Sequence, residues 1–214
     1  MSHLVTLCGR QLEQPGHICA FFDSRVEQYD VLTPYYKEGI DAGEQVVTIV
    51  DGADVHSHCN HIEQRGVDVQ AAIGSQAFKV LSAEETYTSG GRFAADRMYD
   101  LLQNALAQGK KAGKRVRTSG VMDWASRGHP GTEELMDYEA RVNVLVPTYD
   151  CTLLCVYDLA KVTGQEVMDI LATHPFVIHR RQIKENPHYV PPIEMLREVL
   201  FAGTKQSAEQ LEQA

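Results

Sequence analysis

The stretch His17-Ile18-Cys19-Ala20-Phe21-Phe22-Asp23-Ser24 decides the fold of this chain. A mostly apolar run over residues 17–22 predicts a strand that is buried on both faces, as strands of parallel sheets are. Ser24 is a typical helix N-cap, and Glu27 follows three residues later, where a capping box places it. We therefore predict a helix over residues 25–42, kinked at Pro34 and closed by Gly43. A buried strand that leads directly into a helix is the repeating unit of α/β proteins.

The same alternation of strand and helix continues along the chain. Further strands are predicted at residues 45–50, 78–81, 116–122, 151–157 and 176–183, and helices at residues 53–65, 93–112, 133–146 and 164–173. Pro147 is expected to end the helix over 133–146, and Pro191-Pro192 to open a last helix. Short apolar strands separated by helices predict an α/β three-layer sandwich, with a mainly parallel sheet of five to seven strands and helices on both faces.

Length and charge limit the classes of function. The 214 residues, 43% of them hydrophobic and 23% charged, fit one large globular domain. We divide the chain into an N-terminal extension at 1–14, a single domain at 15–200 and a polar C-terminal tail at 201–214. The net charge of −9 argues against direct nucleic-acid binding through a broad basic face. The basic run at residues 110–117 lies where a helix is predicted to end, which favours a helix-dipole role over a phosphate or partner site.

The cysteines and the first residues indicate a reducing compartment. Five cysteines, at positions 8, 19, 59, 151 and 155, form an odd and scattered set that does not resemble a disulfide framework. Residues 1–10 lack the apolar run and cleavage site of a signal peptide, and no window is long and apolar enough to span a membrane. We expect a cytoplasmic protein without a membrane partner, with its thiols free.

The sequence has no phosphate-binding loop. Neither G-x-x-x-x-G-K-[ST] nor G-x-G-x-x-G occurs, and Asp23-Ser24-Arg25-Val26-Glu27 follows the first strand, where such a loop would lie. Acidic side chains there would repel phosphates, so we predict no bound nucleotide and no cofactor. A G-x-S-x-G elbow and an H-E-x-x-H motif are also missing. The sequence by itself therefore does not argue for an enzyme.

Polar residues gather where the predicted strands end. Three Asp residues follow buried strands at positions 51, 123 and 158, beside Trp124 and Tyr157. Parallel sheets bind ligands outside the carboxyl ends of their strands. Each Asp taken alone is explained by helix capping or turn formation, whereas the set as a whole suggests the acidic rim of a pocket. We expect Trp124, the only Trp of the chain, to lie within or beside that pocket.

One helix carries the strongest metal candidate in the sequence. His56, His58, Cys59 and His61 stand close together, and His58 and His61 share a helix face. Histidines beside a thiol can hold zinc or a late transition metal. The spacing matches no standard zinc pattern, and a solvent-facing polar helix explains the same residues. We therefore predict no metal site here.

The first predicted strand carries two residues with chemical potential. His17 and Cys19 are two apart and share one face, and a buried histidine needs a hydrogen-bond partner. One interpretation is that His17 is satisfied by neighbouring groups and Cys19 packs as a small hydrophobe. The other is that both anchor the polar end of a ligand. If the strands over 17–22 and 151–157 are neighbours, Cys19 and Cys155 approach across the sheet, which allows a redox or soft-ligand role.

Several short segments, taken in their order and spacing, resemble the MEDS family, a sensory domain named from methanogens, methylotrophs and a dichloromethane regulator. The resemblance covers residues 15–198 and is carried by Gly16-His17-Ile18-Cys19 with Phe22-Asp23-Ser24, Gly39 with Ala42-Gly43-Glu44, Tyr87 with Gly91-Arg92-Phe93, Trp124-Ala125, Tyr138-Glu139-Ala140-Arg141, Cys155-Val156-Tyr157-Asp158, and Thr173-His174-Pro175 with Asn186-Pro187 and Tyr189-Val190-Pro191-Pro192. In the family, Gly-Glu-Met-Thr often precedes the Trp. This chain has Gly120-Val121-Met122-Asp123 there, so the acidic group has moved.

The resemblance implies a RecA-like or KaiC-like core without a working Walker A motif, in agreement with the missing phosphate loop. It also implies a stand-alone sensory domain that binds a small organic ligand, a hydrocarbon derivative, and signals through a partner protein such as a kinase or regulator. The matching positions imply a ligand pocket that uses His17, Cys19, Phe22, Asp23, Trp124, Tyr138, Glu139, Cys155, Tyr157 and His174.

Two alternatives and the oligomeric state stay open at this point. One alternative is a redox protein or small-molecule enzyme that uses Cys19, Cys155 and a nearby histidine. The other is a metal-binding protein that uses the residues around His58. A homo-oligomer is compatible with all three functions.

Overall fold

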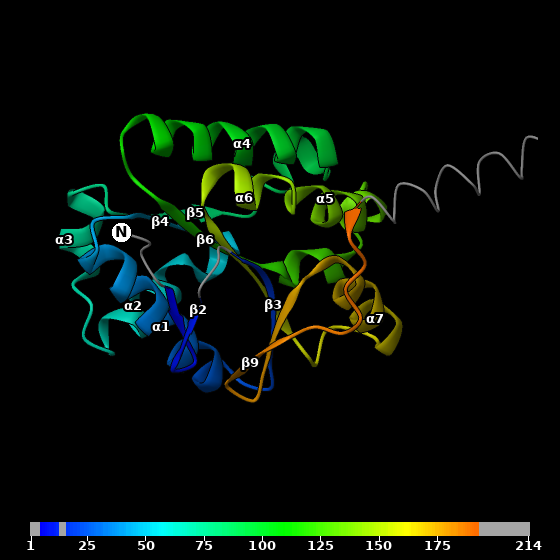
Figure 1. Ribbon diagram of the computed structural model, residues 1–214, viewed down its shortest axis with the longest axis horizontal. Coiled ribbons are helices and arrows are strands. Elements are labelled where there is room, and N and C mark those ends of the chain that lie inside the picture. The colour runs from blue at the N-terminus through cyan, green and yellow to red at the C-terminus, as the bar shows by residue number, and fades with distance from the viewer. Residues whose placement is uncertain (1–4, 13–15, 193–214) are drawn as a thin grey trace, which may run out of the picture.

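The computed structural model describes residues 5–12 and 16–192, and they fold around one large sheet (Figure 1). Its strands are β3 (His17–Phe22), β4 (Gln45–Val50), β5 (Phe78–Ser82), β6 (Val116–Val121), β7 (Thr152–Asp158), β8 (Phe176–His179) and β9 (Gln182–Glu185). Their order is β5-β4-β6-β7-β3-β8-β9, and every neighbouring pair except β8 and β9 is parallel. The predicted α/β fold with a mainly parallel sheet is confirmed.

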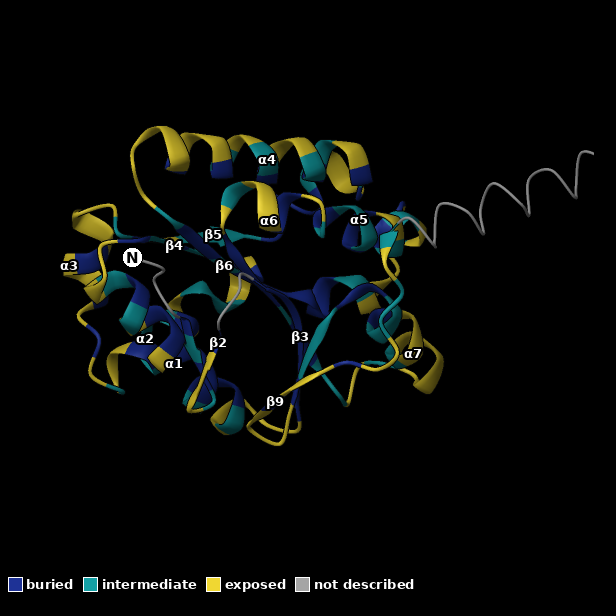
Figure 2. Cartoon of the chain, viewed as in Figure 1, coloured by how far each residue is buried: buried dark blue, intermediate teal, exposed yellow. Residues whose placement is uncertain are grey.

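Helices cover both faces of this sheet and complete the three layers (Figure 1). One face packs against α1 (Arg25–Asp41), α2 (Val55–Glu63) and α3 (Val69–Gly74). The other packs against α4 (Ala95–Lys111), α5 (Leu135–Val142), α6 (Leu145–Tyr149) and α7 (Gly164–Thr173). The central strands are dark blue in Figure 2, and the outer sides of the helices carry most of the exposed yellow residues. None of the described helices is long and apolar enough to cross a membrane.

The alternation of side chains along β3 positions the site. Ile18, Ala20 and Phe22 belong to the core under α1, whereas Cys19 and Phe21 belong to the core under α4, α5 and α7. His17 is two residues before Cys19 and therefore shares its face. The same rule places Cys155 and Tyr157 of β7 on this second face, since both contact the core under α5.

The predicted start of α1 is present in the structure. Ser24 is the N-cap, and its hydroxyl accepts a hydrogen bond from the Glu27 backbone N–H at 3.3 Å. The Glu27 carboxylate accepts from the backbone N–H of Asp23 at 3.2 Å, so the second half of the capping box is shifted by one residue. Pro34 lies inside α1, which the structure assigns as one helix.

The single helix predicted over 133–146 is wrong. The chain forms α5 and then α6, with a break at 143–144, where Asn143 is the C-cap of α5. Pro147 does not end a helix but lies in the first turn of α6, where its missing N–H has no intrahelical partner to lose. Asp150 ends α6 instead, with a left-handed φ of 49°.

The single strand predicted over 176–183 is also wrong, because it is a hairpin of β8 and β9. Arg180 and Arg181 form its turn with φ values of 48° and 55°. Such turns normally carry Asn or Gly, so two arginines give no turn signal in the sequence. The N-terminal extension contains a second hairpin, β1 (Val5–Leu7) and β2 (Arg10–Leu12), and the Thr6 backbone N–H donates to the Glu38 carboxylate at 2.9 Å. The helix predicted to open at Pro191-Pro192 lies outside the described residues beyond position 192, and the polar tail predicted at 201–214 lies wholly outside them.

Candidate functional site

Four polar residues from four separate elements meet beneath α5. His17 comes from the start of β3, Cys155 from the middle of β7, Glu139 from α5, and His174 follows α7. β3 and β7 are neighbouring strands, and Cys19 pairs directly with Cys155. The two cysteines therefore approach each other across the sheet, as expected if these strands are neighbours. Both histidine side chains and the Glu139 side chain are 0% exposed. The cluster therefore lies within the core, on the middle of a sheet face rather than at the strand ends.

The functional atoms of the cluster are in mutual contact. Glu139 Oε2 lies 3.0 Å from His17 Nε2 and 3.5 Å from His174 Nε2. Cys155 Sγ lies 3.4 Å from His17 Nε2 and 3.4 Å from Glu139 Oε2. All four potential ligand atoms lie within 4.8 Å of one another. Among the residues that the structure describes, this is the one group of three or more His, Cys, Asp or Glu side chains so arranged.

Asn143 fixes which nitrogen of His17 carries a proton. Its side-chain amide group donates to three backbone carbonyl oxygens, those of Glu139, Ala140 and Thr173, at 3.2, 3.1 and 2.8 Å. Three carbonyl acceptors identify this atom as the nitrogen, so the oxygen Oδ1 faces His17 Nδ1 at 3.3 Å. An amide oxygen only accepts, and His17 therefore holds a proton on Nδ1.

His174 is fixed in the same way. Its Nδ1 lies 2.8 Å from the Ile170 carbonyl oxygen, which only accepts hydrogen bonds, so Nδ1 carries the proton. Its Nε2 is buried and makes no hydrogen bond. That nitrogen faces the Glu139 carboxylate. Both imidazole rings therefore turn Nε2 toward one carboxylate oxygen.

The charges of the cluster follow from its burial. Burial, together with repulsion from His17, lowers the pKa of His174 to about 3, so His174 is neutral near pH 7. Burial alone would raise the pKa of Glu139, but its hydrogen bond with His17 and its interactions with both histidines outweigh burial and lower it. Burial and the Glu139 carboxylate raise the pKa of Cys155 well above its usual range. The uncomplexed cluster thus contains a carboxylate, a thiol and at least one neutral imidazole.

The contacts from Cys155 through His17 to Asn143 have the order of nucleophile, base and orienting group. A reactive cysteine, however, needs a thiolate in an electropositive and partly open environment. Cys155 instead has a raised pKa and a carboxylate at 3.4 Å. The geometry therefore disfavours a nucleophilic thiol.

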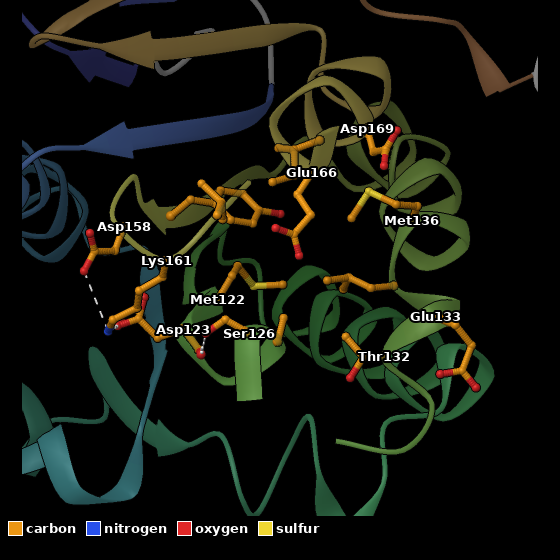
Figure 3. A pocket seen from close by; sticks show the side chains of 15 residues that line it. Met122, Asp123, Ser126, Thr132, Glu133, Met136, Asp158, Lys161, Glu166 and Asp169 are labelled. Carbon is orange, nitrogen blue, oxygen red and sulfur yellow. Dashed lines mark hydrogen bonds and ion pairs between the residues drawn. The ribbon is translucent and has the colours of Figure 1, made fainter. Parts of the chain in front are cut away.

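A cavity of about 260 Å³ opens at the carboxyl ends of β6 and β7 (Figure 3). Its lining combines apolar side chains, including Met122, Leu135 and Met136, with polar and charged groups such as Tyr157 and Glu166. The segment after β6 (Met122–Arg127), α5 and α7 form its walls. The position agrees with the rule that ligands bind outside the carboxyl ends of parallel strands.

Ion pairs neutralise the acidic rim of this edge. Lys161 is paired with Asp123 and lies 3.7 Å from Asp158 (Figure 3). Arg25 lies 3.7 Å from Asp123, and Arg127 is paired with Asp51. The aspartates at the ends of β4, β6 and β7 therefore each have a cationic partner.

Tyr157 connects the cavity to the buried cluster. It lines the cavity, and its hydroxyl donates to Glu139 Oε1 at 3.3 Å. Ile170 lines the same cavity, and its carbonyl oxygen accepts from His174. A change in the cavity can therefore reach two members of the cluster through direct contacts.

Family comparison confirms the resemblance found in the sequence. Residues 16–175 match the family model described as MEDS, the MEthanogen/methylotroph, DcmR Sensory domain. The chain belongs to the MEDS family. A sensory or signalling role follows from this membership. No curated protein sequence matches the chain.

One solved structure supports the fold of this MEDS domain. The chain is similar to the KaiC-like protein PH0186 from Pyrococcus horikoshii OT3, with a TM-score of 0.56 and 8% identity, over 76% of this chain and 70% of that one. It also matches the pCW3 conjugation coupling protein TcpA, monomer form with ATPγS, with a TM-score of 0.43 and 13% identity, over 78% of this chain and 50% of that one. The first likeness places the MEDS domain with KaiC-like and RecA-like cores, and at this identity it concerns the fold alone.

The structure separates the ligand-binding residues expected from the sequence into groups. His17, Glu139, Cys155 and His174 form the cluster, and Tyr157 adjoins it. Tyr138 borders, with Cys155, a second cavity of about 70 Å³ beside the cluster. Cys19 lies on the same sheet face, where its thiol contacts the Phe176 carbonyl oxygen at 3.6 Å. Phe22 packs on the opposite face, and Asp23 is exposed. These two are not brought to the cluster.

Trp124 is 1% exposed and stacks between Tyr87 and Phe93, with ring centroids 5.0 and 5.1 Å away. Its two neighbours in sequence, Asp123 and Ala125, line the larger cavity. Trp124 thus lies behind the cavity wall, and whether it responds to a ligand stays a prediction.

The histidine-rich helix α2 has a different role in packing. His58 is buried, and its Nδ1 lies 2.9 Å from the Tyr29 hydroxyl. His61 stacks on the Tyr29 ring at 4.5 Å, and His56 hydrogen-bonds with the Asn60 amide at 3.0 Å. Cys59 packs partly buried against the same core. His58 and His61 thus both contact Tyr29, whereas His56 and Cys59 contact other groups.

Sequence reasoning missed three residues that the site uses. Asn143 orients His17, and Met122 and Met136 line the cavity. The sequence indicates Asn143 only as a helix cap, because Asn is common near helix ends. Nothing in the sequence indicates that this cap lies against a histidine 126 positions earlier.

Proposed function

We propose that this MEDS domain senses a small organic molecule, a hydrocarbon derivative, in the cavity at the carboxyl ends of β6 and β7. The observation that carries the proposal is the cavity itself, about 260 Å³, whose apolar wall includes Met122, Leu135 and Met136 and whose lining also carries charged groups such as Asp158 and Lys161. Sites for small molecules are concave and mostly apolar, with few orienting polar groups. The volume suits a molecule smaller than a nucleotide.

The edge of the sheet disfavours a nucleotide. A phosphate would meet Asp123 and Asp158, whose cationic partners are already engaged. No glycine-rich loop offers backbone N–H groups after β3, where Asp23 and Ser24 lead into α1. The likeness to a KaiC-like protein therefore concerns architecture and not the bound molecule.

A route for the signal begins at the cavity wall. Lys161 lies on the connection between β7 and α7, and Ile170 lies on α7. A ligand that displaces the Lys161 ion pairs or contacts Ile170 shifts the position of α7. The recipient of this movement is a signalling partner, such as a kinase or regulator.

Binding assays with simple hydrocarbon derivatives test the proposal. Halomethanes, short-chain alcohols and methylamines are titrated individually, with Trp124 fluorescence and melting temperature as readouts. Trp124 is suited to this because its flanking residues line the cavity. We expect at least one compound to bind with saturation.

A pair of matched substitutions locates the binding site. Met136→Phe fills the cavity, whereas Met168→Phe makes the same change on an exposed residue of α7 that does not line it. We expect Met136→Phe to weaken binding tenfold or more, about 1.4 kcal/mol, and Met168→Phe to leave it unchanged. Equal affinities of both variants, or no binding by any compound of the panel, would contradict the proposal.

A further inference from the structure

The four-residue cluster beneath α5 has an electrostatic defect that protein atoms do not resolve. His174 Nε2 is a bare lone pair, because its proton is held at Nδ1 by the Ile170 carbonyl oxygen. This nitrogen is buried without a hydrogen-bond partner and lies 3.5 Å from a carboxylate oxygen. Two electron-rich atoms therefore face each other within the core. A buried unsatisfied group of this kind costs about 1–3 kcal/mol.

A second proton on His17 does not remove the defect. If His17 accepts a second proton, its Nε2–H donates to Glu139 Oε2 at 3.0 Å and satisfies that contact. His174 Nε2 is still without a donor. The Cys155 thiol has one hydrogen, and the atoms within its reach are His17 Nε2 and Glu139 Oε2, both at 3.4 Å. A cation at the centre of the four atoms satisfies all of them at once.

We propose that His17 Nε2, His174 Nε2, Glu139 Oε2 and Cys155 Sγ bind one divalent late transition-metal ion of the zinc class. Zinc prefers tetrahedral sites of nitrogen and sulfur, with bonds of about 2.0–2.3 Å. Those bonds place neighbouring ligand atoms roughly 3.3–3.7 Å apart. Four of the six separations, 3.0, 3.4, 3.4 and 3.5 Å, already approach these edges, and all six are within 4.8 Å.

Outer contacts hold three of the four ligands in the required orientation. His17 donates its Nδ1–H to Asn143 Oδ1, and His174 donates its Nδ1–H to the Ile170 carbonyl oxygen. Tyr157 donates to Glu139 Oε1 and leaves Oε2 for the metal. Histidine ligands of metal sites characteristically donate their other N–H in this way, which fixes the ring and the tautomer. A purely structural polar cluster has no need for both Nε2 atoms to converge.

Cys155 completes the set as the soft ligand. A cation of charge two offsets the raised pKa of the thiol and releases its proton to solvent as the metal binds. Cysteine sulfur excludes magnesium and calcium, which take oxygen ligands. The site lies behind the cavity wall, and its assignment does not depend on a ligand in that cavity.

Metal content and cobalt spectroscopy of the untagged full-length chain test this inference. We expect one zinc per chain after purification without added metal. After chelation, Co²⁺ alone is titrated, and we expect one equivalent to give the visible bands of four-coordinate cobalt with a thiolate-to-cobalt charge-transfer band. A wild-type protein without stoichiometric metal and without these bands would overturn the inference, whatever the variants do.

Two pairs of variants locate the site. Cys155→Ser should abolish the charge-transfer band and His174→Gln should weaken metal binding at least a hundredfold. Their controls, Cys151→Ser and His58→Gln, change a buried cysteine and a buried histidine that lie outside the cluster and should leave binding unchanged. Asn143→Leu removes only the orienting contact to His17, and we expect a 10–100-fold loss. A charge-transfer band retained in Cys155→Ser, unchanged metal binding in His174→Gln, or equal losses in the controls would contradict the assignment.

Discussion

Two polar clusters are built around buried side chains in this protein, and they differ in whether every polar group has a partner. At the amino end of β6, Arg117 is 1% exposed and donates to Glu44 at 2.5 Å, to Glu38 at 3.0 Å and to the Tyr35 carbonyl oxygen at 2.7 Å. Beneath α5, His17 and His174 face a single carboxylate, and one nitrogen has no partner.

The difference separates a structural cluster from a functional one. In the Arg117 cluster every charge has an opposite charge in contact. The guanidinium carbon of Arg117 also lies over the Tyr35 ring, 4.9 Å from its centroid. Nothing from outside the chain is required. The cluster beneath α5 lacks a positive charge at its centre, so it is complete only with a cation. Burial and polarity by themselves therefore do not identify a functional site. A comparison of hydrogen-bond donors and acceptors does, because it shows which buried polar atoms have no partner.

The largest effect is expected at the complete cluster. Arg117→Met leaves the buried Glu44 with only the more distant Arg115, 3.6 Å away, and removing one member of a buried ion pair costs about 3–5 kcal/mol. The matched change Arg65→Met breaks the more exposed pair with Asp30 and should cost less than about 1 kcal/mol. Urea unfolding of both variants measures the free energies. Equal losses would remove the distinction between the two kinds of ion pair.

His58 represents an intermediate case, a buried imidazole with one ring nitrogen partnered and the other without a hydrogen bond. Burial lowers its pKa from 6.5 to about 4. The unfolded chain therefore binds a proton at a higher pH than the folded one, and stability is complete above about pH 6.5 and falls as pH decreases toward 4. At about 1.4 kcal/mol per pKa unit, the loss reaches about 3 kcal/mol.

The measurement is urea unfolding between pH 7 and pH 4 for the wild type and His58→Gln. Glutamine does not titrate, so the variant should lose less stability on acidification, by up to the same amount. Parallel pH profiles of the two proteins would show that His58 does not contribute to acid sensitivity.

Glu139→Gln is expected to give the smallest change in stability. The sign of that change depends on whether metal is bound. In chelated protein, the new amide offers a donor to the histidine nitrogens, so we expect a change within about 1 kcal/mol or a gain. With one equivalent of zinc, the wild type gains stability by mass action, and the variant should gain far less. Melting curves with and without metal measure both. A large loss in the chelated variant would mean that the cluster is complete without a cation.

The fold was largely predictable because strands and helices depend on local pattern. The run over 17–22 and the cap at Ser24 became β3 and the start of α1. Errors arose where backbone conformation had no residue signal, as in the turn at Arg180 and Arg181 with positive φ. At the break between α5 and α6, the Asn143 side chain donates to the carbonyl of Thr173, the last residue of α7. Such a contact has no local signature.

The site was only partly predictable. The family resemblance supplied His17, Glu139, Cys155 and His174, but it placed them with Phe22, which packs on the opposite face of the sheet. Local spacing placed the metal candidate on α2, because four histidines and cysteines stand close in sequence there. The four cluster residues come from positions 17 to 174 and meet only through the order of the strands and the packing of α5. Local pattern does not contain that convergence.

Anomalous X-ray diffraction from crystals of the untagged protein, collected on both sides of the zinc absorption edge, tests the central claim most directly. The account predicts a single peak among His17 Nε2, His174 Nε2, Glu139 Oε2 and Cys155 Sγ, with metal–ligand distances of about 2.0–2.3 Å. Zinc-supplemented crystals with no peak there would contradict it, as would His174 Nε2 in a hydrogen bond to a protein donor.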